Sequence, residues 1–443
     1  DKFSSILPAY IIGIGAEAGG YVGARLQSLL ISVVMLFFFY KFSLTLLENK
    51  TSAVFALIFF AIQAPVIFIS KYASSDIISL TFFTAFLWVS MLIIKNNIPE
   101  QSGLEAKNNI RLSLLAAVLY LLALASNYLV ILFAPAAIII YFMNNKKASI
   151  YFTIVIFASL LFLYLLFSNS INEYLSELTS WNQDSIKISK LLIRIAEYIA
   201  IPVMLIVAAL QMIWKTRYKS SLIYTLLIVS LIIPVYIIVF KDIYNIYRLI
   251  SFSLIFLAPT GGMILAKFIQ MNSNYKYSAI FALYFVILIS FWHISKLENS
   301  YPNTDTVINY CNQNLDGNSV IYCENPFLLS ANFYPGININ NFKNLYYDKQ
   351  FSQMTSSQKT QITSLIQNGN IDYVVLNGMI HPEFSENLKS GYLPGIFVQV
   401  LRQEYNCNSL MYPNSNGNFE IYKLKSSYKR DHQYLANKEF KRD

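Results

Sequence analysis

The sequence predicts a polytopic α-helical membrane protein with about ten spans and a small C-terminal α/β domain. Of its 443 residues, 56% are hydrophobic and only 13% are charged, which is typical of a chain whose main solvent is the bilayer. Apolar runs separated by short polar loops fill residues 26–296, whereas 297–425 is rich in Asn, Lys, Asp and Ser. The charged, aperiodic tail at 426–443 is expected to be disordered.

Ten segments are long and apolar enough to cross the hydrocarbon core, which takes roughly 20 residues in a helix. They lie near 26–47, 52–70, 77–95, 112–126, 128–143, 149–168, 191–214, 220–240, 249–269 and 277–296. Residues 5–22 are also apolar, but they contain Glu17 and, together with Gly23, five glycines. They predict an interfacial or re-entrant segment within an extracytoplasmic stretch, 1–25, and not a span.

The orientation follows from the Lys and Arg residues of the short loops, because cytoplasmic loops carry an excess of them. With the 71–76 loop placed outside, the inside loops carry eleven Lys and Arg residues and the outside loops carry five. This choice also places the C-terminal domain outside. The positive charge of the chain is therefore explained by topology, and nucleic acid is not expected as a partner.

The C-terminal domain has mixed patterns. Helices are predicted at 304–314 and 356–367, and strands at 319–323, 373–377, 397–403 and 419–424. The three cysteines, Cys311, Cys323 and Cys407, have no metal-ligand spacing. A disulfide between Cys311 and Cys323 and three free thiols are both open.

Ionisable side chains at membrane depth are functional candidates, because burying a charge in the bilayer is costly. Asp76 opens an apolar helix on the outer face, where it could serve a site or cap the helix and favour its dipole. Its neighbours Lys71 and Tyr72 could be interface anchors. Glu17 and Arg25 could pair at the interface.

The stretch "KDIYNIYR", residues 241–248, gathers cations and tyrosines between two predicted spans. It could be an aromatic belt with snorkelling ends, or it could hold a phosphate through Arg248, Tyr244 and Tyr247. Arg194 and Glu197 are predicted to pair on one helix face. No Walker loop, GxSxG elbow or HExxH motif is present, so ATP hydrolysis, serine hydrolysis and zincin chemistry have no support.

Four stretches, in this order, resemble the GT-C membrane glycosyltransferases, in particular the bacterial protein mannosyltransferase and lipid A aminoarabinose transferase family. They are "GYVGARLQSLL" with Arg25, "APVIFISKYASSD" with Lys71, Tyr72 and Asp76, "LALASNYLVILFAP", and "YNIYRLISFSLIFLAP" with Arg248. In the third stretch, Ser126 and Asn127 replace the Thr-Lys usual in the family.

The resemblance implies a bacterial inner-membrane enzyme that moves a sugar from a polyprenyl-phosphate donor to a lipid, glycan or protein acceptor, with its C-terminal domain periplasmic or extracellular. Such transfer needs a base for the acceptor hydroxyl and cations for the leaving phosphate. Asp76 aligns with the acidic position and is the candidate catalytic residue. Arg248, Lys2, Lys71, Tyr247 and Tyr244 are candidates for the donor phosphate. Asp1, Tyr72, Arg25 and Glu17 are the other cavity residues, and Asp1 is a weak candidate ligand if a divalent metal is used.

The resemblance also implies a missing part. "DKFSSILPAY" is similar to a segment late in the first extracytoplasmic loop of the family, so the first helix and the usual catalytic carboxylate are expected to be absent. A chain without them is expected to bind lipid phosphate without transferring sugar.

Three other functions stay open. A lipid-linked substrate transporter or flippase would line a path near the midplane with its charges, but the charges gather at the outer face, and neither an inverted repeat nor a broken helix pair is evident. An O-antigen ligase-like enzyme usually has its large loop between spans. A purely structural membrane protein is the third alternative.

Overall fold

The computed structural model describes residues 6–72, 74–95, 103–144, 149–159, 161, 188–189, 191–199, 202, 220–241, 246–270, 273–298, 305–323, 342–343, 364, 371–377, 386, 389–390, 393–407 and 415–425. The chain divides into two compact units, Asp1–Ser295 and Lys296–Asp443. The first unit is helical and the second contains the only described sheet. This division agrees with the boundary that the sequence predicts near residue 297.

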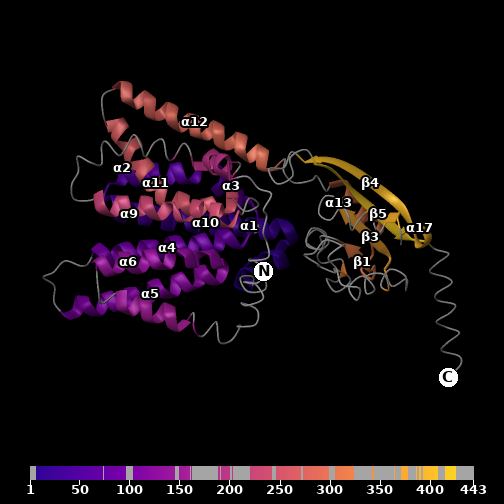
Figure 1. Cartoon of the computed structure of the whole chain (residues 1–443), viewed down its shortest axis with the longest axis horizontal. Helices are drawn as coiled ribbons and strands as arrows, with labels where there is room; N and C mark the ends of the chain where they lie inside the picture. Colours follow the sequence, from indigo (N-terminus) through magenta and orange to yellow (C-terminus); the bar gives the residue numbers. More distant parts are fainter. Residues whose placement is uncertain are drawn as a thin grey trace. The chain divides into compact units, whose positions relative to one another are not determined.

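The helical unit is a bundle whose helices run alongside one another (Figure 1). Its elements are α1 (Ile6–Leu47), α2 (Lys50–Ala61), α3 (Ala64–Lys71), α4 (Ser75–Lys95), α5 (Gly103–Ser126), η1 (Tyr128–Phe133), α6 (Ala134–Asn144), α9 (Ser220–Ser230), α10 (Ile232–Phe240), α11 (Ile246–Gln270) and α12 (Ser273–Glu298). Helix α4 packs between α1 and α5, and α11 packs against α2 and α9.

Among the described residues, five helices are long and apolar enough to cross a membrane, or six if the bent pair α2 and α3 is one span. The five are Val22–Leu47, Ser75–Lys95, Ile223–Phe240, Ile246–Gln270 and Ala279–Leu297. Shorter apolar helices cover Ile110–Ser126, Tyr128–Phe142 and Ser149–Ser159. These positions match predicted spans, while much of 149–168 and 191–214 lies outside the described residues, so the count of ten stays a prediction.

The predicted span at 52–70 is broken, so the expectation that no broken helix pair exists is wrong. Helices α2 and α3 meet at an angle of 65°. Pro65, in the first turn of α3, explains the break, because proline has no N–H to donate to the carbonyl oxygen of Ala61, four residues earlier, and its ring crowds that carbonyl group. The signal was present in the sequence as "QAP" inside an apolar run.

A second proline break is compensated by a side chain. Pro234 in α10 cannot donate to the carbonyl oxygen of Ser230, four residues earlier. The hydroxyl of Ser253 on α11 donates to that oxygen at 2.8 Å, in a fully buried position. Because both residues are buried, such a replacement satisfies a backbone group that would otherwise be costly to bury.

The first part of α1 is separated from the span by a sharp kink. Gly20 adopts a positive φ of 59°, a conformation that favours glycine, and the preceding Gly19 is also non-helical. The two parts fold onto each other, since the side chain of Gln27 donates to the carbonyl of Ile11 at 2.6 Å. The apolar window of α1 that could cross a membrane begins at Val22. The structure thus agrees with the prediction that 5–22 is not a span.

Helices α2 and α11 pack closely through small residues. A Cβ atom added to Gly262 would overlap the backbone of Ala56, and one added to Gly261 would press on the ring of Phe59. Close approach of backbones at small residues is a common way for membrane helices to associate. Nearly all of α11 is buried, which makes it the central helix of the bundle.

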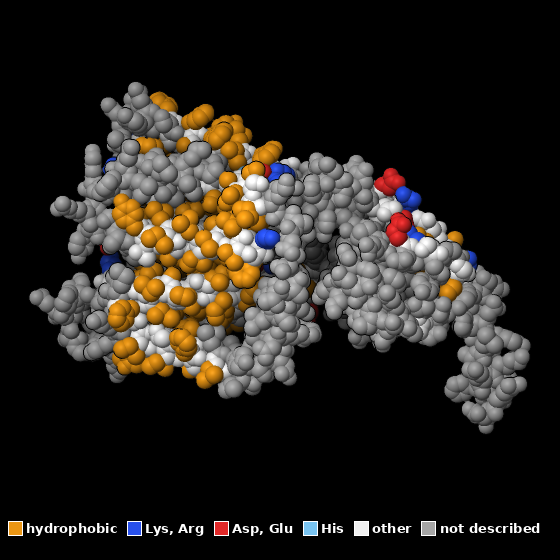
Figure 2. Space-filling view, viewed as in Figure 1, with side chains coloured by type: hydrophobic (Ala, Val, Ile, Leu, Met, Phe, Trp, Pro, Cys, Tyr) orange, Lys and Arg blue, Asp and Glu red, His pale blue; other side chains and the backbone are white. Residues whose placement is uncertain are grey.

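The outer surface of the helical unit is apolar, as Figure 2 shows for one face. Along α12, the exposed large side chains are Tyr277, Ile280, Phe281, Tyr284, Phe285, Leu288, Phe291 and Trp292. An apolar surface of this extent is unfavourable in water and suits contact with lipid tails.

The second unit contains α13 (Asp305–Asn314), β1 (Ile321–Cys323), β2 (Phe342–Lys343), β3 (Tyr373–Asn377), α17 (Leu393–Ile396), β4 (Phe397–Cys407) and β5 (Ser415–Leu424). The strand order is β2-β1-β3-β5-β4, with β1 parallel to its neighbours and β5 antiparallel to β3 and β4. The predicted helix at 304–314 and all four predicted strands are confirmed. The predicted helix at 356–367 and the tail lie outside the described residues, apart from Ser364.

Helix α13 packs one face of this sheet through Val307 and Cys311, against Tyr373, Phe419 and Ile421. Cys311 and Cys323 are buried thiols, so the disulfide between them is not present. Burial raises the pKa of the Cys311 thiol to about 12, so it stays protonated at neutral pH.

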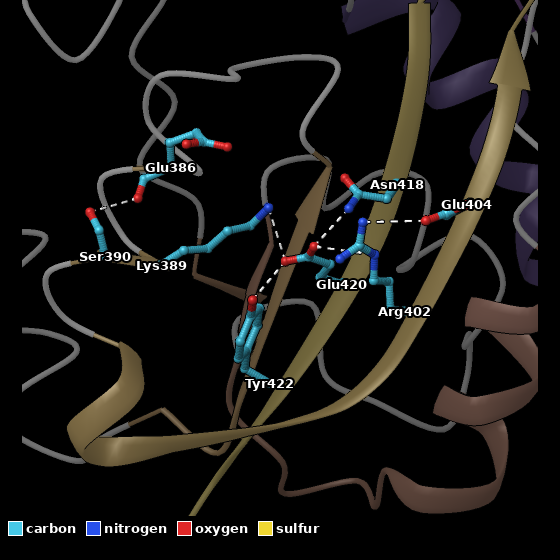
Figure 3. A network of polar contacts seen from close by, with 8 residues as sticks. All are labelled: Glu386, Lys389, Ser390, Arg402, Glu404, Asn418, Glu420 and Tyr422. Carbon is cyan, nitrogen blue, oxygen red and sulfur yellow. Dashed lines mark hydrogen bonds and ion pairs between the residues drawn. The ribbon is translucent and has the colours of Figure 1, made fainter.

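A buried carboxylate, Glu420, organises polar side chains on the opposite face of the sheet (Figure 3). It accepts hydrogen bonds from the hydroxyl of Tyr422 at 2.6 Å and the amide of Asn418 at 2.7 Å. It also forms an ion pair of 2.9 Å with Lys389. Burial and the bond to Glu420 raise the pKa of the Tyr422 phenol, which therefore remains a donor. The network connects the β4–β5 hairpin to the segment that carries Lys389.

Gly262→Ala is expected to destabilise the helical unit, because the added methyl group would force α11 away from Ala56. Overpacking of this kind costs about 1–3 kcal/mol. The measurement is the thermal unfolding midpoint of the purified protein in detergent. Gly13→Ala is the matched control, since a Cβ there meets nothing within 4 Å. Equal midpoints for the two variants would contradict the proposed close packing.

Candidate functional site

Asp76 lies in the first turn of α4 and is 1% exposed. Its two carboxylate oxygens contact side chains of two other elements. Oδ2 accepts from Nε of Arg248 at 2.6 Å, and Oδ1 accepts from Nδ2 of Asn127 at 2.9 Å. A buried carboxylate is tolerated when it is paired and hydrogen-bonded, and both conditions hold here.

Arg248 lies in the first turn of α11, 172 residues away from Asp76 in the chain. Its side chain is 34% exposed, whereas that of Asp76 is 1% exposed. The ion pair therefore joins a buried carboxylate to a partly exposed arginine side chain. Nε uses one of the five N–H donors of the guanidinium group, and the other four are on Nη1 and Nη2.

Asn127 occupies the break between α5 and η1 and is 6% exposed. Its Oδ1 accepts from the backbone N–H of Leu129 at 3.0 Å and caps η1, while its Nδ2 donates to Asp76. We name Asp76, Arg248 and Asn127 the charge triad. The sequence indicated a break at "SNY", and the family resemblance placed Asn127 where a lysine is usual, but Asn127 was not among the predicted site residues.

The triad places the first turns of α4 and α11 and the end of α5 at the same level of the bundle. Asp76 and Arg248 thus lie at one end of the bundle. The five spans predicted between α4 and α11 and the placement of both loops outside the membrane stay predictions.

A row of ring contacts connects Arg25 to the residue before Arg248. The guanidinium carbon of Arg25, on α1, lies 5.2 Å from the ring centroid of Tyr72. The Tyr72 ring lies 4.4 Å from the Phe68 ring, which lies 4.8 Å from the ring of Tyr247. A cation over an aromatic face is attracted to it, so this row fixes Arg25 beside α3. The structure thus connects three predicted site residues, Arg25, Tyr72 and Tyr247, through Phe68, which sequence reasoning missed.

The other predicted residues have different positions. Lys71 ends α3 with an exposed side chain, and Glu17 is exposed on the first part of α1. Asp1, Lys2 and Tyr244 lie outside the described residues. Elsewhere in the bundle, the predicted pair of Arg194 with both carboxylate oxygens of Glu197 is confirmed at 2.9–3.0 Å.

The chemistry of the triad does not suit a metal ion. Asp76 is its single carboxylate, and both of its oxygens already accept from an arginine and an amide. Among the described residues, no group of three or more His, Cys, Asp or Glu side chains could hold a metal. Asp1, the predicted weak ligand, lies outside those residues.

A bundle of apolar helices with charged side chains at one end, followed by a small α/β unit, is the GT-C-like architecture that the sequence predicts. No protein-family model and no curated protein matches the chain by sequence. Solved structures do match. ArnT from Cupriavidus metallidurans in the apo state is similar with a TM-score of 0.56 at 10% sequence identity, over 95% of this chain and 87% of that one.

The same ArnT bound to undecaprenyl phosphate gives a TM-score of 0.55 at 10% identity, with the same coverage. The archaeal oligosaccharyltransferase AglB from Archaeoglobus fulgidus, in complex with an inhibitory peptide and a dolichol-phosphate, gives 0.48 at 10% identity, over 86% of this chain and 62% of that one. This last likeness is too weak to support an inference. The likeness to ArnT shows that the two chains share a fold.

The ion pair of the triad is expected to make the effects of substituting its two residues on the stability of the protein non-additive. Asp76→Asn and Arg248→Gln should each lower the unfolding midpoint, and the double variant should lose less than the sum, with a coupling of about 1–3 kcal/mol. Glu48→Gln and Lys95→Gln form the control cycle, because that pair is 3.8 Å apart and about half exposed. Additive losses in both cycles would show that the Asp76–Arg248 contact adds no stability.

Proposed function

We propose that this protein is a GT-C membrane glycosyltransferase that uses a polyprenyl-phosphate sugar donor. The observation that carries the proposal is the charge triad, with its partly exposed arginine held at the end of a bundle that has the ArnT fold. A polyprenyl phosphate keeps its tail among apolar helices and its phosphate at the membrane surface, so its charge would meet the helix ends. The ArnT structure that contains undecaprenyl phosphate supports this class of ligand.

In this proposal, Arg248 holds the donor phosphate and neutralises the charge that develops as the phosphate leaves the sugar. Tyr247 lies beside Arg248, and Lys71, Arg25 and Lys2 are further candidates for the same anion. Tyr244 and Asp1 are proposed as site residues from sequence alone.

Asp76 is proposed to act through Arg248. A general base has to take a proton from the acceptor hydroxyl, but the oxygens of Asp76 are buried and already accept from Arg248 and Asn127. Its carboxylate holds the guanidinium group in one orientation through the 2.6 Å contact with Nε. Asp76 is thus a positioning residue, and the group that activates the acceptor belongs to another part of the chain or to the acceptor itself.

One observation, the broken helix pair α2 and α3, supports the transporter alternative. The charges favour the transferase, because Asp76 and Arg248 both lie in first turns at helix ends and not at the middle of a span. The acceptor class (lipid, glycan or protein) and the sugar stay open in the proposal.

The test is breakage of the bond between sugar and phosphate. The full-length protein in vesicles, supplied with lipids extracted from bacterial membranes, is expected to convert a polyprenyl-phospho-sugar into polyprenyl phosphate, and the conversion is followed by mass spectrometry. Arg248→Ala should lower turnover and the binding of undecaprenyl phosphate by at least about tenfold, and Lys95→Ala should change neither. A lipid that crosses the vesicle membrane with its sugar intact would favour the transporter.

We also propose that the triad and the C-terminal unit face the outside of a bacterial inner membrane, on the basis of the Lys and Arg asymmetry. A membrane-impermeant thiol reagent applied to intact cells is expected to label Glu404→Cys and not Lys50→Cys, both of which replace exposed residues. The unmodified chain gives the background. Labelling of Lys50→Cys alone would mean that the orientation is inverted.

A further inference from the structure

The net charge of the triad is set by the residue at position 127. Among the described residues, Asp76 has one cationic partner, Arg248, and its other oxygen accepts from the neutral carboxamide of Asn127. The charges of Asp76 and Arg248 therefore add up to zero. A lysine could occupy the same place and donate to the same oxygen, and it would raise the sum to plus one.

This charge difference would have a large electrostatic effect on a bound anion, because the triad is poorly solvated. Asp76 is 1% exposed and Asn127 is 6% exposed, so little water screens a charge placed there. The carboxamide of Asn127 and the guanidinium of Arg248 are separated by the width of a single carboxylate. A charge on residue 127 would thus act on the same lipid phosphate that Arg248 is proposed to hold.

Donor and product of the proposed reaction differ in charge. A polyprenyl-phospho-sugar is a phosphodiester with one negative charge, whereas polyprenyl phosphate is a monoester with about 1.5–2 charges at neutral pH, by analogy with other phosphomonoesters. A site with extra positive charge would favour the monoester, which is the product. The Asp76–Arg248 pair, which has no net charge and whose arginine is partly exposed, favours the phosphomonoester product less.

We propose that Asn127 is a specificity-determining residue: it adds no charge beside the Asp76–Arg248 pair and so limits the positive charge of the site, which then holds the phosphodiester donor without retaining the phosphomonoester product. This inference rests on the proposed function. Asn127 acts through Asp76 and Arg248, and its second role, the cap on η1, requires only the acceptor Oδ1.

The two roles are separated by a matched pair of variants, Asn127→Lys and Asn127→Met. Both remove the cap and the amide and have side chains of similar length, but only lysine adds a charge. If position 127 is purely structural, the two variants should lose stability and lipid affinity alike. If it sets the charge, lysine should bind undecaprenyl phosphate about tenfold more tightly than methionine, the effect of one nearby charge.

The probes are undecaprenyl phosphate and its monomethyl ester, which has the same tail and a single negative charge. We expect the gain of lysine over methionine to be several-fold larger for the phosphate than for the methyl ester, and to shrink at high salt. Binding is measured on the full chain in detergent, and unfolding midpoints are recorded separately. Asn127→Asp should weaken the binding of undecaprenyl phosphate relative to the unchanged protein.

Each outcome has one meaning. Equal affinities of the lysine and methionine variants for undecaprenyl phosphate would overturn the role of Asn127 while leaving the proposed function intact. Equal gains for the phosphate and its methyl ester would overturn the selectivity between donor and product. Failure of the unchanged protein to bind either lipid would instead count against the proposed function.

Discussion

The buried ion pair between Asp76 and Arg248 is the interaction on which the helical unit depends most. A carboxylate inside a membrane bundle is costly unless it is paired and hydrogen-bonded, so once Asp76 is buried the positions of its partners are fixed. These partners come from α11 and from the break between α5 and η1. One side chain thereby sets the relative level of α4, α5 and α11.

The residues beneath the triad show why the pair lies at the end of the bundle. Two turns further along α4, Phe83 packs against Phe133 of η1 and Phe252 of α11, with ring centroids 5.1 and 6.0 Å apart. This aromatic layer has no group that could solvate a charge. Below it, the close contact of α2 and α11 at Gly262 leaves no space for a polar ligand. The buried carboxylate Asp76 therefore lies at one end of the bundle, where its partner Arg248 is partly exposed.

The sequence predicted the elements better than the contacts between them. Hydropathy located the spans, alternation located four strands, and the cost of burying charge pointed to Asp76 and Arg248 separately. Their pairing was not visible, because the two residues are 172 positions apart and a first-turn carboxylate is equally consistent with a helix cap. Asn127 was missed for a related reason. Pro65 did signal the break between α2 and α3, but a long apolar run around it concealed the bend.

The two units use buried carboxylates in different ways. In the C-terminal unit, Asn418 and Tyr422 lie two residues on either side of Glu420 on one strand, so the network is largely built by local strand geometry. Its distant partner, Lys389, adds one segment to a hairpin that already exists. The partners of Asp76 are all distant, and one of them, Arg248, is partly exposed. A ligand that contacts Arg248 would therefore be coupled to the packing of three helices, whereas a ligand at the Glu420 network would meet a hairpin that is already fixed.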